Sequence, residues 1–356
     1  MIRYFDMFAG IGGFRSGFEK AGGFECVGFC EIDKYAIKSY RAMYDTEGEV
    51  YYDDARKIIP EQLPDFDLIC GGFPCQPFSR EGGRAGMSDP RGTLFFEIAR
   101  IAAVKRPKYL LLENVPGLLD HDKGRTFQTI LHTLEKLGYD VTWSVLNGLD
   151  FGSAQQRKRV FIIGYDREKC SGRTLPVCGA ARKPDSENSD MTVFSNGEKE
   201  LIKGEKSELF SKYGIPIKVK TNTGYMPALP GDSIDLSYPN LNSRRGRVGH
   251  SIAHTLTTSA NQGFYYMTSD TMPENIHTVK TAEIDGVPFT GHIRRLTPLE
   301  YWRLQGFTDE QFFKAKAAGV SDRQLYKQAG NAVTVNVIEA LAKFIKEIEK
   351  ENTENE

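Results

Sequence analysis

The sequence lacks any apolar run long enough to span a bilayer, so a membrane partner is not expected. Residues 1–10 also lack the basic and apolar regions that precede the cleavage site of a secretory signal. The six cysteines contain no Cys-x-x-Cys pair, which argues against a zinc site or a disulfide framework, and no metal is expected. Together these absences indicate a cytoplasmic protein in a reducing environment.

An excess of charge of either sign is also missing, because 46 Lys and Arg nearly balance 47 Asp and Glu and leave a net charge of -1. Whole-chain electrostatics therefore gives no sign of nucleic-acid binding, and any such site must be locally basic. Three compact basic clusters exist, at residues 155–159, 244–247 and 294–295. Each cluster taken alone is equally compatible with ordinary solvated charge.

Short apolar, β-rich runs alternate with helical patterns over residues 2–165, which is the signature of βαβ units and a mostly parallel sheet. The expected strands are Tyr4–Phe8, Glu25–Cys30, Asp67–Cys70, Tyr109–Leu112, Val141–Leu146 and Arg159–Ile163. The expected helices are Phe14–Lys20, Tyr35–Met43, Leu94–Val104 and Thr126–Leu137. A generic α/β domain could host many chemistries, so function must come from the loops.

A change of composition after this region predicts a second unit. Gly, Ser, Thr, Asn and Pro become frequent, and only Ile215–Lys220 and His254–Thr258 suggest strands. Helical patterns return at Pro298–Leu304 and after Val335. We therefore predict one domain of residues 1–165 plus 291–350, an inserted smaller domain of residues 166–290, and a frayed acidic tail of residues 351–356.

The first strand is followed by a glycine-rich turn, Asp6 to Phe14, that opens a helix. Glycine lets the backbone approach a ligand closely, and the start of a helix presents free N–H groups. Glu31 follows the second strand about 20 residues later, where an acid can accept ribose hydroxyls, so a nucleotide-like ligand is expected. Arg15 occupies the place of the third glycine of a dinucleotide fingerprint, which disfavours NAD and predicts looser packing of the helix.

A cysteine, Cys75, lies between two prolines just after an apolar strand, at the edge where parallel sheets place their ligands. An isolated cysteine is usually a small buried hydrophobe, and we interpret Cys70 in this way. Cys75 differs because two prolines and two glycines hold its loop without an evident packing benefit. The run from Gly72 to Ser79 resembles the Pro-Cys loop of the DNA cytosine-5 methyltransferases, in which the cysteine is the nucleophile.

The resemblance covers residues 1–165 and 293–345 and implies an S-adenosyl-L-methionine-dependent methyltransferase fold, Rossmann-like and mostly parallel, with an inserted loop-rich target-recognition domain. It also implies S-adenosyl-L-methionine as the cofactor, with Asp53 as a rival to Asp54 for the adenine. The implied cofactor contacts are Phe8, Gly10, Ile11, Gly12, Gly13, Glu31, Ile32, Asp54, Ala55, Leu94 and Asn331.

The same resemblance implies a catalytic set of Cys75, Glu113, Arg157 and Arg159. When a thiolate adds to C6 of cytosine, negative charge moves toward N3, and a carboxyl group there stabilises it. A buried glutamate paired with an arginine is the structural alternative for Glu113, and both can hold at once. Alternate arginines on a strand face one side, so Arg157 and Arg159 are both expected at the site.

Cytosine in a duplex hides C5 and C6, so the base must flip out, and residues 80–90 with their glycines are expected to close over it, with Ser79–Gly86 as a lid. Residues Ala253–Thr257 resemble a Thr-Leu element that positions the DNA strand. The candidate DNA contacts are Ser79, Asn242, Arg245 and Thr255. The arginines at 244–247 could instead touch only phosphates, without reading sequence.

The expected function is methyl transfer to C5 of cytosine in a specific duplex sequence, through a Cys75–C6 adduct. The length, without a further regulatory domain, suggests a prokaryotic or phage enzyme that acts as a monomer and protects DNA from a cognate restriction endonuclease. The alternatives are a tRNA cytosine-5 methyltransferase of the same fold, an inactive DNA-binding regulator and an NAD-dependent oxidoreductase. The long insertion disfavours the tRNA enzyme, and the intact catalytic set disfavours the regulator. Arg15 and the Cys75 loop disfavour the oxidoreductase.

Overall fold

The structure is a computed structural model that describes residues 1–74, 94–170, 214–218, 225–236, 248–268, 278–284 and 287–354. Five predictions fall outside these residues: Cys75, Ser79, the loop at residues 80–90 with its lid Ser79–Gly86, Asn242 and Arg245.

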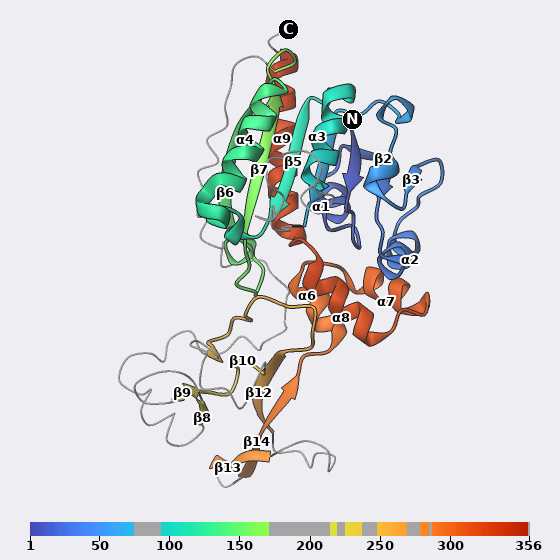
Figure 1. The fold of residues 1–356 in the computed structure, drawn as a ribbon. Coiled ribbons are helices and arrows are strands. Elements are labelled where there is room, and N and C mark those ends of the chain that lie inside the picture. The colour runs from blue at the N-terminus through green and yellow to red at the C-terminus, as the bar shows by residue number, and fades with distance from the viewer. Residues whose placement is uncertain are drawn as a thin grey trace.

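A seven-stranded sheet forms the centre of the molecule, in the order β3-β2-β1-β4-β5-β7-β6 (Figure 1). Its strands are β1 Ile2–Met7, β2 Phe24–Cys30, β3 Val50–Tyr52, β4 Leu68–Gly72, β5 Tyr109–Asn114, β6 Tyr139–Asn147 and β7 Lys158–Asp166. The first five strands in this order pair in parallel, whereas β7 is antiparallel to both β5 and β6. The mostly parallel sheet predicted from the sequence is confirmed, while the reversed β7 was not predicted.

Helices cover both faces of this sheet. One face is covered by α1 (Gly13–Ala21) and α9 (Val335–Glu354), and the other by α3 (Leu94–Lys105) and α4 (Arg125–Lys136). Leu110 and Leu112 of β5 join the core under α3 and α4, whereas Leu111 joins the core under α1 and α9. Burial on both faces explains why the strands read as continuous apolar runs instead of alternating ones. None of the described helices is both long and apolar enough to cross a membrane.

The helix α1 packs tightly on α9, contrary to the looser packing that Arg15 suggested. A Cβ added at Gly17 would lie 2.5 Å from Cβ of Ile338, and one added at Gly13 would lie 2.6 Å from Cγ1 of Val333. These two glycines, one helical turn apart, provide the close approach that the dinucleotide fingerprint assigns to its third glycine.

A second helical layer consists of α2 (Lys34–Met43), α6 (Pro298–Leu304), α7 (Asp309–Ala317) and α8 (Asp322–Asn331). These helices share a core around the fully buried Trp302. Thr297 and Thr308 begin α6 and α7 with capping boxes, in which Glu300 and Gln311 return hydrogen bonds to the cap residues. Figure 1 shows α6, α7 and α8 between the large sheet and a smaller sheet.

The smaller sheet has five antiparallel strands in the order β11-β10-β12-β14-β13. They are β10 Ser233–Asp235, β11 Val248–Gly249, β12 Gln262–Thr268, β13 Thr278–Ile284 and β14 Val287–Arg295, and a separate hairpin pairs β8 Ile215–Lys218 with β9 Tyr225–Ala228. Short 3-10 turns occupy Ala55–Lys57, Pro60–Gln62, Pro116–Leu118, His121–Gly124 and Gly148–Phe151. The division into two domains stays a prediction.

The strand predicted at His254–Thr258 is wrong. Residues 254–258 form no strand, and the isolated bridge nearby joins Gln155 to Ala253, directly before them. The polar groups of this segment bond elsewhere: the Leu256 N–H donates to Oε1 of Gln155 at 2.8 Å, and the Thr255 hydroxyl donates to the Gln156 carbonyl at 2.6 Å. The Thr-Leu-Thr pattern resembles a strand, but contacts from residues about 100 positions away determine its conformation.

Candidate active site

One large cleft, of about 650 Å³, opens at the carboxyl ends of β1, β2, β4 and β5. Most of the predicted site residues line it, namely Phe8, Gly10, Ile11, Glu31, Ile32, Asp54, Ala55, Leu94, Glu113, Arg157, Arg159 and Asn331. The reversed direction of β7 matters here, because it brings the amino end of that strand, with Arg157 and Arg159, to the same edge of the sheet. The volume lies in the range of cofactor sites.

The glycine-rich turn after β1 is held in an unusual backbone conformation. Phe8, Gly10 and Gly12 have φ angles of 55°, 57° and 79°. The Gly12 N–H closes the turn by donating to the Ala9 carbonyl at 2.8 Å. Left-handed conformations are costly for a residue with a side chain, and such residues concentrate at ligand sites. Phe8 both adopts this conformation and lines the cleft, so the turn is shaped for a ligand.

Glu31 is fixed by backbone N–H groups. Its Oε2 accepts from Gly10 at 2.7 Å, and its Oε1 accepts from Ile32 at 2.9 Å and from Asp33 at 2.7 Å. A carboxylate offers about four acceptor positions, so roughly one, on Oε2, is left for a ligand hydroxyl. Glu31 therefore ties the turn after β1 to the end of β2 and presents one oxygen to the cleft.

The other predicted cofactor residues form the rim of the cleft. Ile32 is 70% exposed, an unusual position for a large apolar side chain and a suitable one for packing on a flat ring. Asp54 begins a 3-10 turn and pairs with Arg56 at 2.6 Å, and these hydrogen bonds lower its pKa to about 2. Asp53 also lines the cleft but pairs with Lys57 and is far more exposed. Asn331 is the exposed last residue of α8.

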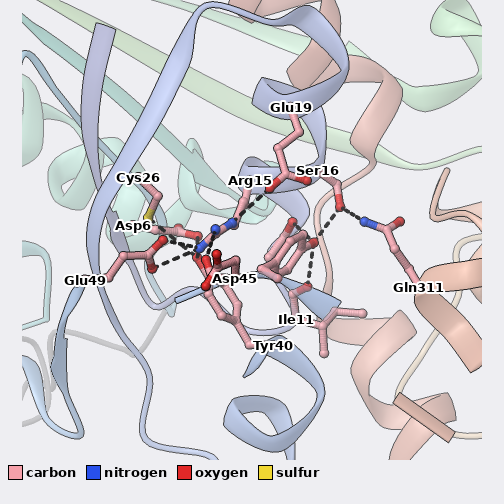
Figure 2. A network of polar contacts seen from close by, with 12 residues as sticks. Asp6, Ile11, Arg15, Ser16, Glu19, Cys26, Tyr40, Asp45, Glu49 and Gln311 are labelled. Atoms are coloured by element: carbon pink, nitrogen blue, oxygen red, sulfur yellow. Dashed lines mark hydrogen bonds and ion pairs between the residues drawn. The ribbon is translucent and has the colours of Figure 1, made fainter. Parts of the chain in front are cut away.

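Gly12 and Gly13 do not line the cleft, and their direct contact with a cofactor stays a prediction. A Cβ at Gly12 would meet the ring of Tyr44 at 2.5 Å, and Gly13 faces Val333. The neighbouring Arg15 is buried and bonds to Glu19, Glu49 and the Asp45 carbonyl, within the network in Figure 2. This part of the turn is therefore built for packing beneath the cleft.

Glu113 and Arg159 form an ion pair inside the cleft, with Arg159 Nε 2.9 Å from Glu113 Oε1. Each side chain is only 14% exposed. Burial raises the pKa of Glu113 above its ordinary value, and the charges of Arg159 and Arg157 oppose that rise. Burial also lowers the pKa of Arg159. The result is a carboxyl group that can take up a proton more readily than an exposed glutamate while an arginine holds its orientation.

Arg157 has a different set of contacts. Its guanidinium donates to the carbonyl oxygens of Leu256, Gly330 and Ala332 at 3.2, 2.9 and 2.8 Å, and only 3% of the residue is exposed. Burial lowers its pKa to about 9. The geometry makes Arg157 a residue that fastens the end of α8 and the Thr-Leu element to β7, while its contact with a base stays a prediction.

Asn114, directly after Glu113, supports the neighbouring loop. Its Nδ2 donates to the Phe73 carbonyl at 2.8 Å, and its Oδ1 accepts from the Val115 N–H at 2.8 Å. Phe73 and Pro74, which precede the predicted nucleophile Cys75, line the cleft. The Asn114 amide thus fixes the direction in which the chain leaves β4.

The hydroxyl of Thr255 donates to the Gln156 carbonyl, and this hydrogen bond places Thr255 next to the chain segment with which Arg157 enters the cleft. The next residues pack on α8 at Gly330, where an added Cβ would lie 2.2 Å from the Thr257 carbonyl oxygen. The sequence predicted a cofactor contact at Asn331 and gave no sign of a packing role for the glycine before it. The approach of two backbones separated by more than 70 residues explains this glycine, and no local pattern signals it.

Three further cleft residues were missed from the sequence. Gly72 pairs with Glu113 across β4 and β5, and a Cβ there would lie 2.8 Å from Oε2 of Glu113. Asp33 and Lys327 form an ion pair of 2.6 Å that joins α2 to α8 at the rim of the cleft. The Gly71-Gly72 pair was a visible signal, whereas the ion pair joins residues 294 positions apart.

Comparison with known proteins identifies the class. A family model described as C-5 cytosine-specific DNA methylase matches residues 2–347, so the chain belongs to the DNA cytosine-5 methyltransferases. Type II methyltransferase M1.ScrFI of Lactococcus lactis subsp. cremoris is 36% identical over 350 residues, which cover 96% of this chain and 77% of that protein. Orphan methyltransferase M.SPRI of Bacillus phage SPR is 32% identical over 433 residues, which cover 96% of this chain and 97% of that protein.

The fold agrees with this class. The crystal structure of the S. pombe Dnmt2 methyltransferase superposes with a TM-score of 0.60 at 17% identity, over 98% of this chain and 99% of that one. The Rossmann-like methyltransferase fold predicted from the sequence is therefore confirmed. The protein is a DNA cytosine-5 methyltransferase, related to methyltransferases of type II restriction-modification systems, and its substrate is DNA.

Proposed function

We propose that this enzyme transfers a methyl group from S-adenosyl-L-methionine to C5 of a flipped-out cytosine, through a covalent bond between Cys75 and C6. One observation carries the proposal: Glu31 and the Glu113–Arg159 pair lie in the same cleft of about 650 Å³. An acid for a ribose and a buried, orientated carboxyl group for a base are thereby available within one cavity.

The residues present fit S-adenosyl-L-methionine. The turn at Phe8–Gly10 and the free position on Glu31 suit a ribose, and Ile32 offers an apolar surface to an adenine. Asp54 can accept the adenine amino group, and Asn331 can bond to the amino-acid end of the cofactor. When bound, S-adenosyl-L-methionine supplies an electrophilic methyl group.

Glu113 supports the addition step. As the Cys75 thiolate forms a bond to C6, electron density moves toward N3, and a protonated Glu113 can donate a hydrogen bond there. The raised pKa of Glu113 favours the protonated form, and Arg159 keeps the carboxyl group in place. After C5 has taken up the methyl group, its proton passes to a basic group or to water, the C5–C6 double bond re-forms, and the bond between Cys75 and C6 breaks to release the thiolate.

Recognition of the DNA sequence is assigned to the inserted domain of residues 166–290. We propose that Asn242 and Arg245 approach the base pair, that Ser79 and Thr255 contact the strand, and that Ser79–Gly86 acts as the lid. The type II relatives support a pairing with a restriction endonuclease. The bacterial and phage sources of the relatives support action on DNA in a prokaryotic cytoplasm, and we propose a monomer.

Tritiated S-adenosyl-L-methionine, incubated with the enzyme and either duplex DNA or tRNA, tests this proposal. Label is expected in DNA and absent from tRNA. A Cys75→Ser variant should bind the cofactor normally and transfer no label. Label in tRNA alone, or normal turnover by Cys75→Ser, would contradict the proposal.

A further inference from the structure

A relay of hydrogen bonds runs from α7 to the cofactor turn. Nε2 of Gln311 donates to Oγ of Ser16 at 2.8 Å, and the Ser16 and Tyr44 hydroxyls lie 2.6 Å apart. The Tyr44 hydroxyl donates to the carbonyls of Gly12 at 2.9 Å and Ile11 at 3.2 Å. Figure 2 shows a dashed line from Gln311 to Ser16, with Ile11 of the cofactor turn in the same network.

The direction of the relay follows from its ends. Oε1 of Gln311 accepts from the Thr308 N–H at 3.0 Å, so its amide nitrogen must face Ser16. Carbonyl oxygens only accept, so Tyr44 spends its single proton on the turn and must accept from Ser16. The two carbonyls of the turn share the Tyr44 proton, so the relay runs in the order Gln311, Ser16, Tyr44 and cofactor turn.

The ring of Tyr44 is held as firmly as its hydroxyl. Tyr44 is 6% exposed, and the Arg15 guanidinium lies 4.7 Å from the centre of its ring. The ring also leaves no room for a Cβ at Gly12, whose φ is 79°. The turn that contains the cleft residues Gly10 and Ile11 therefore rests on Tyr44.

We propose that Tyr44 is a positioning residue for the cofactor, and that Gln311 and Ser16 hold its hydroxyl in place. The relay fixes the Ile11 and Gly12 carbonyls, and thereby the turn whose Gly10 N–H orients Glu31. Gln311 belongs to α7, which follows the predicted inserted domain in the chain. The relay therefore joins cofactor binding to the packing of the C-terminal helices. This inference rests on the proposed use of S-adenosyl-L-methionine.

Tyr44→Phe in the full-length enzyme removes the hydroxyl and keeps the ring. We expect the Kd for S-adenosyl-L-methionine, measured by calorimetry, to rise about tenfold, the size associated with one lost buried hydrogen bond. KM for the cofactor should rise in parallel, while kcat at saturating cofactor should fall less than twofold. Gln311→Ala should raise Kd about threefold, and its effect should largely disappear in the Tyr44→Phe background, because the relay passes through Tyr44.

Tyr139→Phe is the matched control. Tyr139 is buried as well, and its hydroxyl donates to the Pro107 carbonyl at 2.8 Å, which does not belong to the cofactor turn. Loss of the Tyr139 hydroxyl should lower Tm about as much as Tyr44→Phe does and leave the Kd for S-adenosyl-L-methionine unchanged. A Kd for S-adenosyl-L-methionine in Tyr44→Phe equal to that of the wild type would overturn the inference. An equal loss of cofactor affinity in Tyr44→Phe and Tyr139→Phe would also overturn it. Failure of the wild-type enzyme to bind S-adenosyl-L-methionine would instead overturn the proposed function.

Discussion

Replacing Gly72 with alanine tests whether the position of the Glu113 carboxylate determines the rate. Gly72 lies on β4 opposite Glu113, and its φ is not in the left-handed region, so alanine is compatible with the backbone. The new Cβ would lie 2.8 Å from Oε2 of Glu113, whereas ordinary contacts begin near 3.4 Å. The carboxylate is the flexible end of a side chain, so it moves and the strands stay in place.

The displacement required is about 0.6 Å, the difference between these two distances. Misplacement of a catalytic group by ~1 Å can cost about a hundredfold in rate, so we expect kcat to fall about tenfold to hundredfold. Stability should change by no more than about 1 kcal/mol, because alanine in place of glycine also reduces the entropy of the unfolded chain. The Kd for the cofactor should stay at its wild-type value.

The assay is steady-state methylation of duplex DNA together with thermal unfolding. Gly117→Ala is the control, because its Cβ would have nothing within 4 Å and its backbone is also compatible with alanine. Glu113→Gln alone should reduce kcat by about a hundredfold or more, and adding Gly72→Ala should then cost little. A Gly72→Ala enzyme with the full wild-type kcat would refute the reasoning that the placement of Glu113 limits the reaction.

Three further outcomes follow from the structure. Asp6 is fully buried, and burial raises its pKa from 3.8 to about 7. The folded state therefore favours the protonated carboxyl group, so the contribution of Asp6 to the free energy of unfolding is complete below about pH 4 and is lost as pH rises through about 7. In urea unfolding between pH 4.5 and 8, Asp6→Asn should remove roughly 3 kcal/mol of pH dependence, and parallel curves for the two proteins would count against the shift. Gly330→Ala should lower stability by about 1–3 kcal/mol in the same measurement, because its Cβ would meet the Thr257 backbone at 2.2 Å, and an unchanged Tm would show that this approach is not tight. Ile32→Ala should weaken cofactor binding roughly fivefold in calorimetry, through lost apolar contact at the rim, and an unchanged Kd would remove Ile32 from the cofactor site.

The sequence predicted the features that local chemistry constrains. The glycine-rich turn, Glu31 after β2 and Glu113 near the end of β5 each follow from a short pattern, and the structure brings them to one cleft. Strand periodicity also placed Arg157 and Arg159 on one side, but it could not distinguish their contacts. Arg159 pairs with Glu113, whereas Arg157 binds carbonyls from two distant segments.

Long-range packing explains what the sequence did not predict. The direction of β7 is set by its pairing with β5 and β6. A buried strand at this position is an apolar run whether it is parallel or antiparallel, so its sequence does not indicate its direction. The role of Gly330 depends on Thr257, and that of Tyr44 depends on Gln311 in α7. Each pair is distant in sequence, so neither member carries a local signal of its partner.

A covalent trapping experiment tests the central claim most directly. Duplex DNA that contains 5-fluorocytosine at the target position cannot lose a proton from C5, so an enzyme that forms a bond to C6 stays attached after methyl transfer. The account predicts a stable protein–DNA adduct that requires S-adenosyl-L-methionine and maps to Cys75 by peptide mass spectrometry. Methylation of unmodified duplex DNA without any such adduct, or an adduct at another residue, would contradict it.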